Sequence, residues 1–137
     1  MKIYIAGPLF NEKDRDFLEE IDKICKELGF DTFLPHRDVG LWKQGIDFKK
    51  IAQGDLKGFE ECDLMLANLS GFNISAGTVW EMGYSYAKKI PVIGIKVNCK
   101  IKECVEEISA IVMGTTEFVE SLEELKKRLK EFKEKNG

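Results

Sequence analysis

The sequence of 137 residues predicts an α/β fold: a flavodoxin- or Rossmann-like sandwich with a mostly parallel five-stranded sheet and helices on both faces. Two observations support this prediction. Short apolar runs alternate with longer amphipathic stretches, an order that builds parallel sheets. In addition, residues 64–67 (LMLA) are continuously apolar, which is typical of a strand buried on both faces.

In the first part of the chain, residues 2–6 are predicted as a strand because β-branched and aromatic side chains dominate them. A helix follows from residue 11, with apolar residues at helical spacing and Gly29 as its C-cap. Residues 31–34 then form a short strand, and residues 35–46 are predicted as a loop.

In the middle of the chain, a second helix is expected over residues 47–61, before the buried strand 64–67. A loop over residues 69–77 leads into a third helix that ends near residue 88. Residues 91–95 are predicted as the fourth strand.

In the last third, the sequence predicts a short helix over residues 101–112 and an edge strand over residues 116–119. A terminal helix over residues 121–135 begins with Ser121 as N-cap and Glu124 three residues later, which is a capping box. The chain contains no repeat, linker or low-complexity tract.

The composition fits one globular domain over residues 1–137, with 44% hydrophobic and 33% charged residues. No apolar run approaches the roughly 20 residues of a membrane span, and the N-terminus lacks a signal peptide, so we expect a cytoplasmic protein with no membrane partner. A net charge of -3 argues against a nucleic-acid polymer as partner but leaves room for a small anionic ligand.

Metal and disulfide chemistry is not expected. The chain has a single histidine, His36, and its cysteines (Cys25, Cys62, Cys99 and Cys104) form no CxxC pair. Two nucleotide-binding motifs, GxGxxG and GxxxxGK[ST], are also missing, which argues against dinucleotide and P-loop functions.

The most informative segment is residues 75–84 (SAGTVWEMGY), which crosses from a loop into a helix. Gly77 lets the backbone approach a ligand closely, and Ser75 or Thr78 can cap the helix. Glu81 then lies near the first turn, where the helix dipole favours the ionised carboxylate that a nucleophile requires. The alternative is that Thr78 and Glu81 form only a capping box.

Other polar residues also have two interpretations. Asp55 lies within a predicted helix, where aspartate has poor propensity, so it is either held by another group or faces solvent. Tyr4 is either a core residue or reaches a pocket with its hydroxyl. Asp63 is interpreted as a strand-start cap, and residues 36–38 as ordinary loop polarity.

Taken together, these segments resemble the nucleoside 2-deoxyribosyltransferase family, including the related 2'-deoxynucleoside 5'-monophosphate N-glycosidases. The resemblance covers most of the chain and rests on residues 4–10 (YIAGPLF), 54–56 (GDL), 75–84 and 91–93 (PVI). The pattern Gly-Thr-x-x-Glu-x-Gly is fairly specific when it lies between a buried strand and a helix.

The resemblance implies a retaining double displacement without a metal or organic cofactor. Glu81 would attack C1' of the sugar and form a glycosyl-enzyme, Asp55 would handle the proton of the base, and Tyr4 would position the nucleophile. Substrate contacts are expected at Gly7, Gly77 and Phe10, with the Phe10 ring a better candidate than Trp42 for stacking on a base.

Two serines depart from the transferase pattern. Six residues before the nucleophile, transferases often carry an Asp that contacts the sugar 5'-hydroxyl, and here Ser75 stands there. Ser109 stands where a neighbouring subunit often supplies Asn. Serines at both places resemble the monophosphate N-glycosidases, since a hydroxyl can donate a hydrogen bond to a phosphate that a carboxylate would repel. They can equally be a helix cap and a helix-surface serine.

The loop after the first strand is more transferase-like, because residues 8–10 carry no charge to pair with phosphate. Arg37 or Lys43 are candidates for that charge.

The prediction leans to a 2'-deoxynucleoside 5'-monophosphate N-hydrolase acting on a small molecule. Base exchange on free deoxynucleosides, a non-catalytic nucleotide-binding module and a purely structural subunit are the alternatives. A homo-oligomer is expected, a dimer or larger, with Ser109 completing the neighbour's site.

Overall fold

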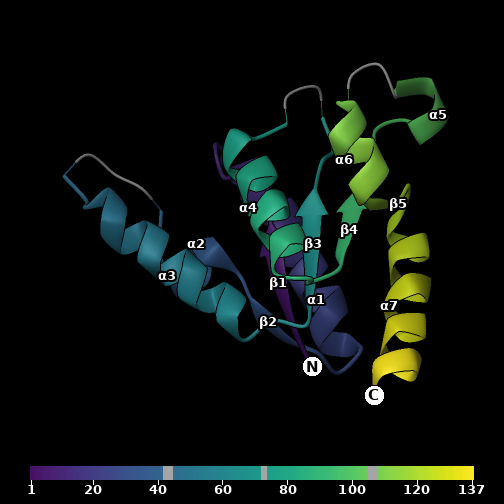
Figure 1. Ribbon diagram of the computed structural model, residues 1–137, viewed down its shortest axis with the longest axis horizontal. Coiled ribbons are helices and arrows are strands. Elements are labelled where there is room, and N and C mark those ends of the chain that lie inside the picture. Colours follow the sequence, from purple (N-terminus) through teal and green to yellow (C-terminus); the bar gives the residue numbers. More distant parts are fainter. Residues whose placement is uncertain (42–44, 72–73, 105–107) are drawn as a thin grey trace.

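One parallel sheet organises the chain, and Figure 1 shows it in the computed structural model, which describes residues 1–41, 45–71, 74–104 and 108–137. The strand order is β2-β1-β3-β4-β5, and every neighbouring pair is parallel. The strands are β1 (Lys2–Ala6), β2 (Asp31–Phe33), β3 (Leu64–Asn68), β4 (Val92–Ile95) and β5 (Glu117–Val119). The predicted α/β fold is confirmed, and the order reverses between β1 and β3, where such sheets open a crevice at their carboxyl ends.

Helices connect the strands and cover both faces of the sheet (Figure 1). They are α1 (Glu12–Glu27), α2 (Pro35–Asp38), α3 (Phe48–Glu60), α4 (Ala76–Ala87), α5 (Ile101–Cys104), α6 (Ala110–Thr115) and α7 (Leu122–Asn136).

Two predicted boundaries are wrong. Residues 35–46 were expected to be a loop, but residues 35–38 form the short helix α2, because Pro35 at its start is already fixed in a helix-compatible conformation. The single helix expected over residues 101–112 is two helices. Ser109 has an extended backbone (φ −64°, ψ 150°) and precedes α6, so the apolar spacing continues while the helix does not.

Alternation along the strands builds two cores. Ile3 and Ile5 pack with α1 and α7 on one face, whereas Tyr4 and Ala6 pack on the opposite face with α3, α4 and α6. The same alternation runs along β3, so each buried strand supplies both cores. Tyr4 therefore points toward α3 and α4, although it belongs to a central strand.

Serines at helix starts hold two helix ends in place. Ser121 accepts the backbone N–H of Glu124 at 3.1 Å, as the capping box predicts, while the Glu124 carboxylate accepts from Glu120 rather than from Ser121. Ser75 is the N-cap of α4. No helix in the described part of the chain is both long and apolar enough to cross a membrane.

Candidate active site

A cavity of about 490 Å³ lies at the carboxyl ends of the central strands, between the loop after β1, the α2 region, α3 and the start of α4. Its lining includes six of the residues singled out from the sequence: Gly7, Phe10, Asp55, Ser75, Gly77 and Glu81. Tyr4 reaches this group through Glu81. These residues are far apart in the sequence, and the sheet brings them to one place.

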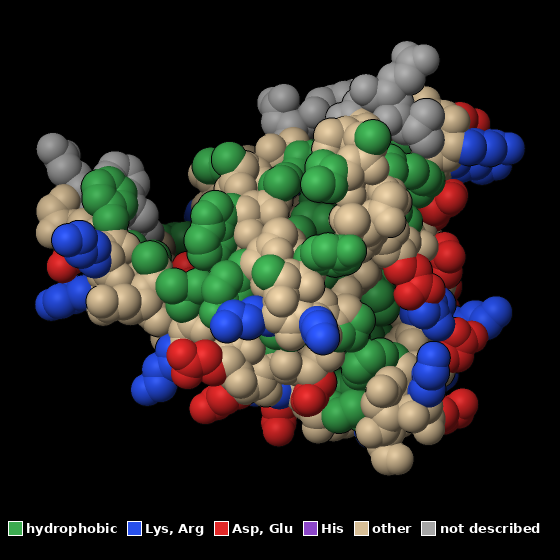
Figure 2. Space-filling model, in the orientation of Figure 1, with side chains coloured by type: hydrophobic (Ala, Val, Ile, Leu, Met, Phe, Trp, Pro, Cys, Tyr) green, Lys and Arg blue, Asp and Glu red, His purple; other side chains and the backbone are tan. Residues whose placement is uncertain are grey.

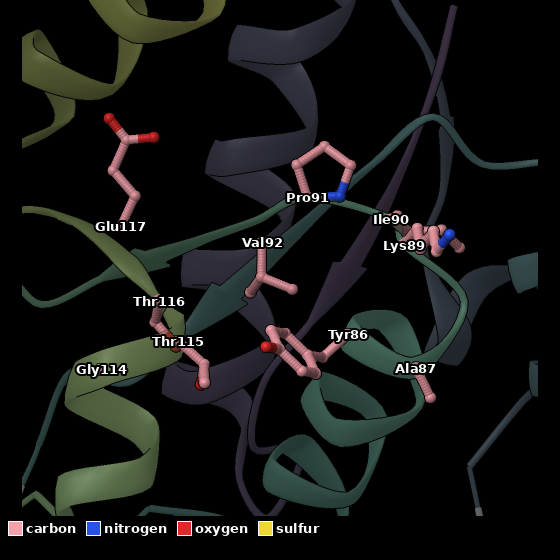
Figure 3. A pocket seen from close by; sticks show the side chains of 10 residues that line it. All are labelled: Tyr86, Ala87, Lys89, Ile90, Pro91, Val92, Gly114, Thr115, Thr116 and Glu117. Carbon is pink, nitrogen blue, oxygen red and sulfur yellow. The ribbon is translucent and has the colours of Figure 1, made fainter.

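A larger hollow of about 810 Å³ lies at the opposite ends of β4 and β5. Figure 3 shows its lining, in which Tyr86, Val92 and Thr115 surround the space and Glu117 and Lys89 are the charged side chains. It has one carboxylate and no paired acids among its lining residues. We therefore place the candidate active site in the smaller cavity.

Glu81 is held by Tyr4. The Tyr4 hydroxyl on β1 donates a hydrogen bond to Oε2 of Glu81 on α4. Because α4 begins at Ala76, Glu81 lies in the second turn, not the first. The capping-box alternative for Thr78 and Glu81 is also wrong, since Ser75 is the N-cap and its Oγ accepts the Thr78 N–H at 3.4 Å.

Burial dominates the electrostatics of Glu81. Partial desolvation raises its pKa to about 7, the Tyr4 hydrogen bond pulls the pKa down, and the negative charge of Asp55 pushes it up. Because Glu81 lies in the second turn of α4 and the helix dipole acts mainly on the first, burial disfavours the ionised form more than the dipole favours it. Near neutral pH, Glu81 exchanges between its acid and its carboxylate.

Asp55 is the second acid of the cavity. It lies on α3, and its Oδ1 is buried and has no hydrogen-bond partner among the described residues. Burial raises the pKa of Asp55 to about 6. Two carboxyl groups with pKa values shifted toward neutrality in one cavity are a typical arrangement for acid–base or nucleophilic chemistry.

Two glycines that line the cavity differ in how much space a Cβ would have. A Cβ on Gly7 would lie 2.7 Å from Leu18 Cδ2 and 3.0 Å from Asn68 Cβ, so packing demands glycine there. A Cβ on Gly77 would meet only Ser75 Oγ, at 3.7 Å, and the remaining space belongs to the cavity. At the rim, Phe10 is 79% exposed.

Sequence reasoning missed Arg15, a cation that lines the cavity. Its Nη1 donates to the Leu9 carbonyl at 3.0 Å, which fixes the loop after β1. The sequence feature that could have identified Arg15 is its position in the first turn of a helix that begins at the carboxyl end of the sheet. Arg37, one predicted source of positive charge, instead pairs with Asp22 and Asp38, and Lys43 lies outside the described residues.

Ser109 is not brought to the cavity of its own chain. It is the exposed N-cap residue of α6 and makes no capping hydrogen bond with its side chain, so it is not a serine on a helix surface. Trp42, the weaker candidate for base stacking, lies outside the described residues. The role of Ser109 in a neighbour's site stays a prediction.

The remaining polar candidates have ordinary contacts. Asp63 accepts the Lys2 N–H at 2.9 Å at the start of β1, and His36 Nε2 lies 3.3 Å from Glu19 Oε1. All four cysteines are free thiols. Across the described ranges, no three His, Cys, Asp or Glu side chains gather in a way that could hold a metal ion.

Comparisons with known proteins find a family and a fold that this chain matches. The sequence model of the nucleoside 2-deoxyribosyltransferase family matches residues 3–112. A search of curated proteins finds no match.

Several solved structures share the fold. A 2-deoxyribosyltransferase from Bacillus psychrosaccharolyticus has a TM-score of 0.77 at 21% identity, over 92% of this chain and 90% of that one. A conserved protein from Enterococcus faecalis V583 has a TM-score of 0.73 at 27% identity, over 96% and 98%. A CMP N-glycosidase from Clostridium botulinum has a TM-score of 0.60 at 17% identity, over 97% and 98%.

The raised pKa of Glu81 predicts a gain in stability for Glu81→Gln at alkaline pH. The folded pKa of about 7 exceeds the ordinary 4.5, so the stability contributed by this group is present below pH 4.5 and is lost as pH rises through 7. Glutamine cannot ionise and escapes this loss. We expect a gain of about 2 kcal/mol in the free energy of unfolding at pH 8, measured by urea denaturation.

The gain should shrink toward pH 5, where wild-type Glu81 is mostly protonated. Glu60→Gln, a matched change at an exposed position of α3, should leave the pH profile unaltered. A Glu81→Gln profile parallel to that of the wild type would contradict the assigned pKa.

Proposed function

Because the chain belongs to the nucleoside 2-deoxyribosyltransferase family, we propose that it cleaves the N-glycosidic bond of 2'-deoxynucleosides or their 5'-monophosphates through a covalent intermediate on Glu81. The observation that carries this proposal is the geometry of the cavity. One carboxylate oxygen of Glu81 is held by Tyr4, and the acid Asp55 lies in the same cavity with an unpaired oxygen.

The proposed reaction has two displacements at C1'. In the first, the free carboxylate oxygen of Glu81 forms a bond to C1' as the bond to the base nitrogen breaks, and Asp55 donates its proton to the departing base. In the second, water or another base attacks C1' and releases Glu81, while Asp55 takes the proton of the attacking group. A pKa of about 6 suits Asp55 to both steps near neutral pH.

Hydrolysis of monophosphates is the form of this activity that we favour. An aspartate in the place of Ser75 would repel a phosphate, whereas the serine hydroxyl does not. Ser75 also lies at the N-terminus of α4, where backbone N–H groups favour anions. Arg15 adds a positive charge to the cavity lining. Base exchange on free deoxynucleosides is the second candidate, favoured by the uncharged loop of residues 8–10. A non-catalytic binding module would not need the two acids.

We also propose that the protein acts as a homo-oligomer, a dimer or larger, in which Ser109 reaches a neighbour's cavity. Ser109 directly precedes α6, and α6 and α4 expose a shared apolar surface of Val79, Tyr86 and Ile111. Figure 2 shows hydrophobic side chains gathered over these helices. Exposed apolar surface beside a residue that misses its own cavity supports this arrangement.

Product analysis tests the proposed activity. Deoxynucleoside monophosphates and free deoxynucleosides, each with and without a second base, are incubated with the enzyme and separated by chromatography. We expect free base and deoxyribose 5-phosphate from the monophosphates, and no turnover by Glu81→Ala. Glu60→Ala is the matched control and should retain activity. Base exchange only would favour the transferase, and full activity of Glu81→Ala would refute the mechanism.

Arg15→Gln should lower kcat/KM for monophosphates more than for free nucleosides, by about tenfold, because it removes a charge-assisted contact with the 5'-phosphate. Lys13→Gln removes the same charge from the same turn of α1 outside this cavity and should leave the ratio unchanged. Steady-state kinetics on matched pairs of substrates measure the ratio. Equal losses of kcat/KM on both substrates would mean that Arg15 only holds the loop through the Leu9 carbonyl.

The oligomer is tested by light scattering together with activity. Ile111→Glu places a charge on the shared apolar surface and should shift the protein toward monomer and lower its activity, while Lys130→Glu on the exposed side of α7 should do neither. A wild-type monomer with full activity would contradict this part of the proposal.

A further inference from the structure

The position of the Tyr4 hydroxyl depends on the orientation of its ring. The backbone of Tyr4 is fixed by pairing with β2 on one side and β3 on the other. The side chain is fully buried, and its hydroxyl reaches across to Glu81 on α4. Backbone pairing does not fix the side-chain torsions, so neighbouring side chains must set the ring plane.

Two aromatic rings lie nearly parallel to the Tyr4 ring. Phe33, its register partner on β2, has its centroid 5.2 Å away with an interplanar angle of 14°. Phe59, from α3, has its centroid 3.8 Å away with an angle of 16°. Stacked rings resist rotation out of a common plane, because any tilt loses contact area or creates overlap.

Gly58 makes room for this stack. A Cβ on Gly58 would lie 2.7 to 2.8 Å from three carbons of the Phe33 ring. Glycine within a helix costs about 1 kcal/mol relative to alanine, so its place near the end of α3 needs a compensating contact. The Phe33 ring packed against the bare backbone of α3 is that contact.

The same packing also helps to position Asp55. Gly58 and Phe59 are the buried residues of α3, whereas residues 48–50 at its start are exposed. Asp55 precedes Phe59 by four residues and therefore lies on the same side of the helix, one turn away. Figure 1 shows the first turns of α3 leading away from the sheet. The contact of Gly54 with Val39 and the anchor at the end of the helix together determine where Asp55 lies.

We infer that Phe33 and Phe59 are positioning residues for the reaction, which orient the Tyr4 hydroxyl on Glu81 and seat the helix that carries Asp55, with Gly58 admitting the Phe33 ring. The roles of Glu81 and Asp55 in this inference rest on the proposed function. Phe33 acts on Tyr4 through ring stacking and touches α3 at Gly58, whereas Phe59 is itself a residue of α3 and acts on both Tyr4 and the position of α3.

The inference is tested with Phe33→Leu, Tyr4→Phe and the double variant. Phe33→Leu should lower kcat by at least about tenfold with little change in KM, because a misplaced catalytic group slows the chemistry more than binding. In the Tyr4→Phe background, the same change should cost much less than it does in the wild type, since the hydroxyl that the Phe33 ring orients is already gone and what is still lost is the contact of that ring with Gly58. Phe33→Tyr keeps the flat ring and should restore kcat.

Two controls separate positioning from loss of stability. Phe118→Leu truncates a partly buried ring of the same apolar cluster on β5, away from Tyr4, and should lower the melting temperature without lowering kcat. Phe59→Leu in the Tyr4→Phe background should still lose activity, because α3 also loses the packing contact that holds it on the sheet. Additive losses for Phe33→Leu and Tyr4→Phe, or equal loss of kcat in Phe118→Leu, would overturn the inference.

A second measurement needs no turnover. The pKa of the Glu81 carboxyl, followed by carbon NMR, should rise by about one pH unit in Tyr4→Phe and similarly in Phe33→Leu, because both weaken a hydrogen bond to the ionised form. If the wild type shows no glycosidic cleavage but these titrations shift together, the proposed function fails and the positioning stands. If Phe33→Leu leaves the titration of Glu81 unchanged, the positioning fails whatever the activity.

Discussion

A hydrogen bond from the middle of the sheet to a helix is the interaction on which the candidate site depends. Burial raises the pKa of Glu81 to about 7, and the Tyr4 hydroxyl is the partner that opposes this effect by stabilising the ionised carboxylate. The donor belongs to β1, and the acceptor belongs to α4. The ionisation of the Glu81 carboxylate is therefore tied to how the helix packs on the sheet, and a disturbance on either side shifts its pKa.

The cavity contains polar groups that the folded chain does not satisfy by itself. Asp55 Oδ1 and Thr78 Oγ1 are buried without a hydrogen-bond partner among the described residues, and the two carboxyl groups repel each other when both are ionised. Each unsatisfied group weakens the fold. A ligand that donates hydrogen bonds to these oxygens would relieve that cost, so part of the stability that the chain gives up becomes available for binding.

Much of the fold was predictable because apolar runs and turn residues mark the strands directly, as for Lys2–Ala6. The separation of α5 from α6 was not, since apolar spacing continues from one to the other, whereas Ser109 directly before α6 has an extended backbone. In the site, the Gly-Thr-x-x-Glu-x-Gly pattern identified Glu81, a carboxylate that lines the cavity. Arg15 escaped detection because an arginine on an amphipathic helix looks like any solvated charge until the sheet turns it toward a cavity.

The glycines of this region differ in what a larger side chain would disturb. At Gly7 and Gly58 an added Cβ would lie 3.0 Å or less from side-chain atoms of the protein, so a larger residue there disturbs the packing of the fold. Gly77 has room for a methyl group, and the only loss would be volume in the cavity. A substitution at Gly77 therefore changes the cavity, whereas a substitution at Gly7 or Gly58 changes the packing of the fold.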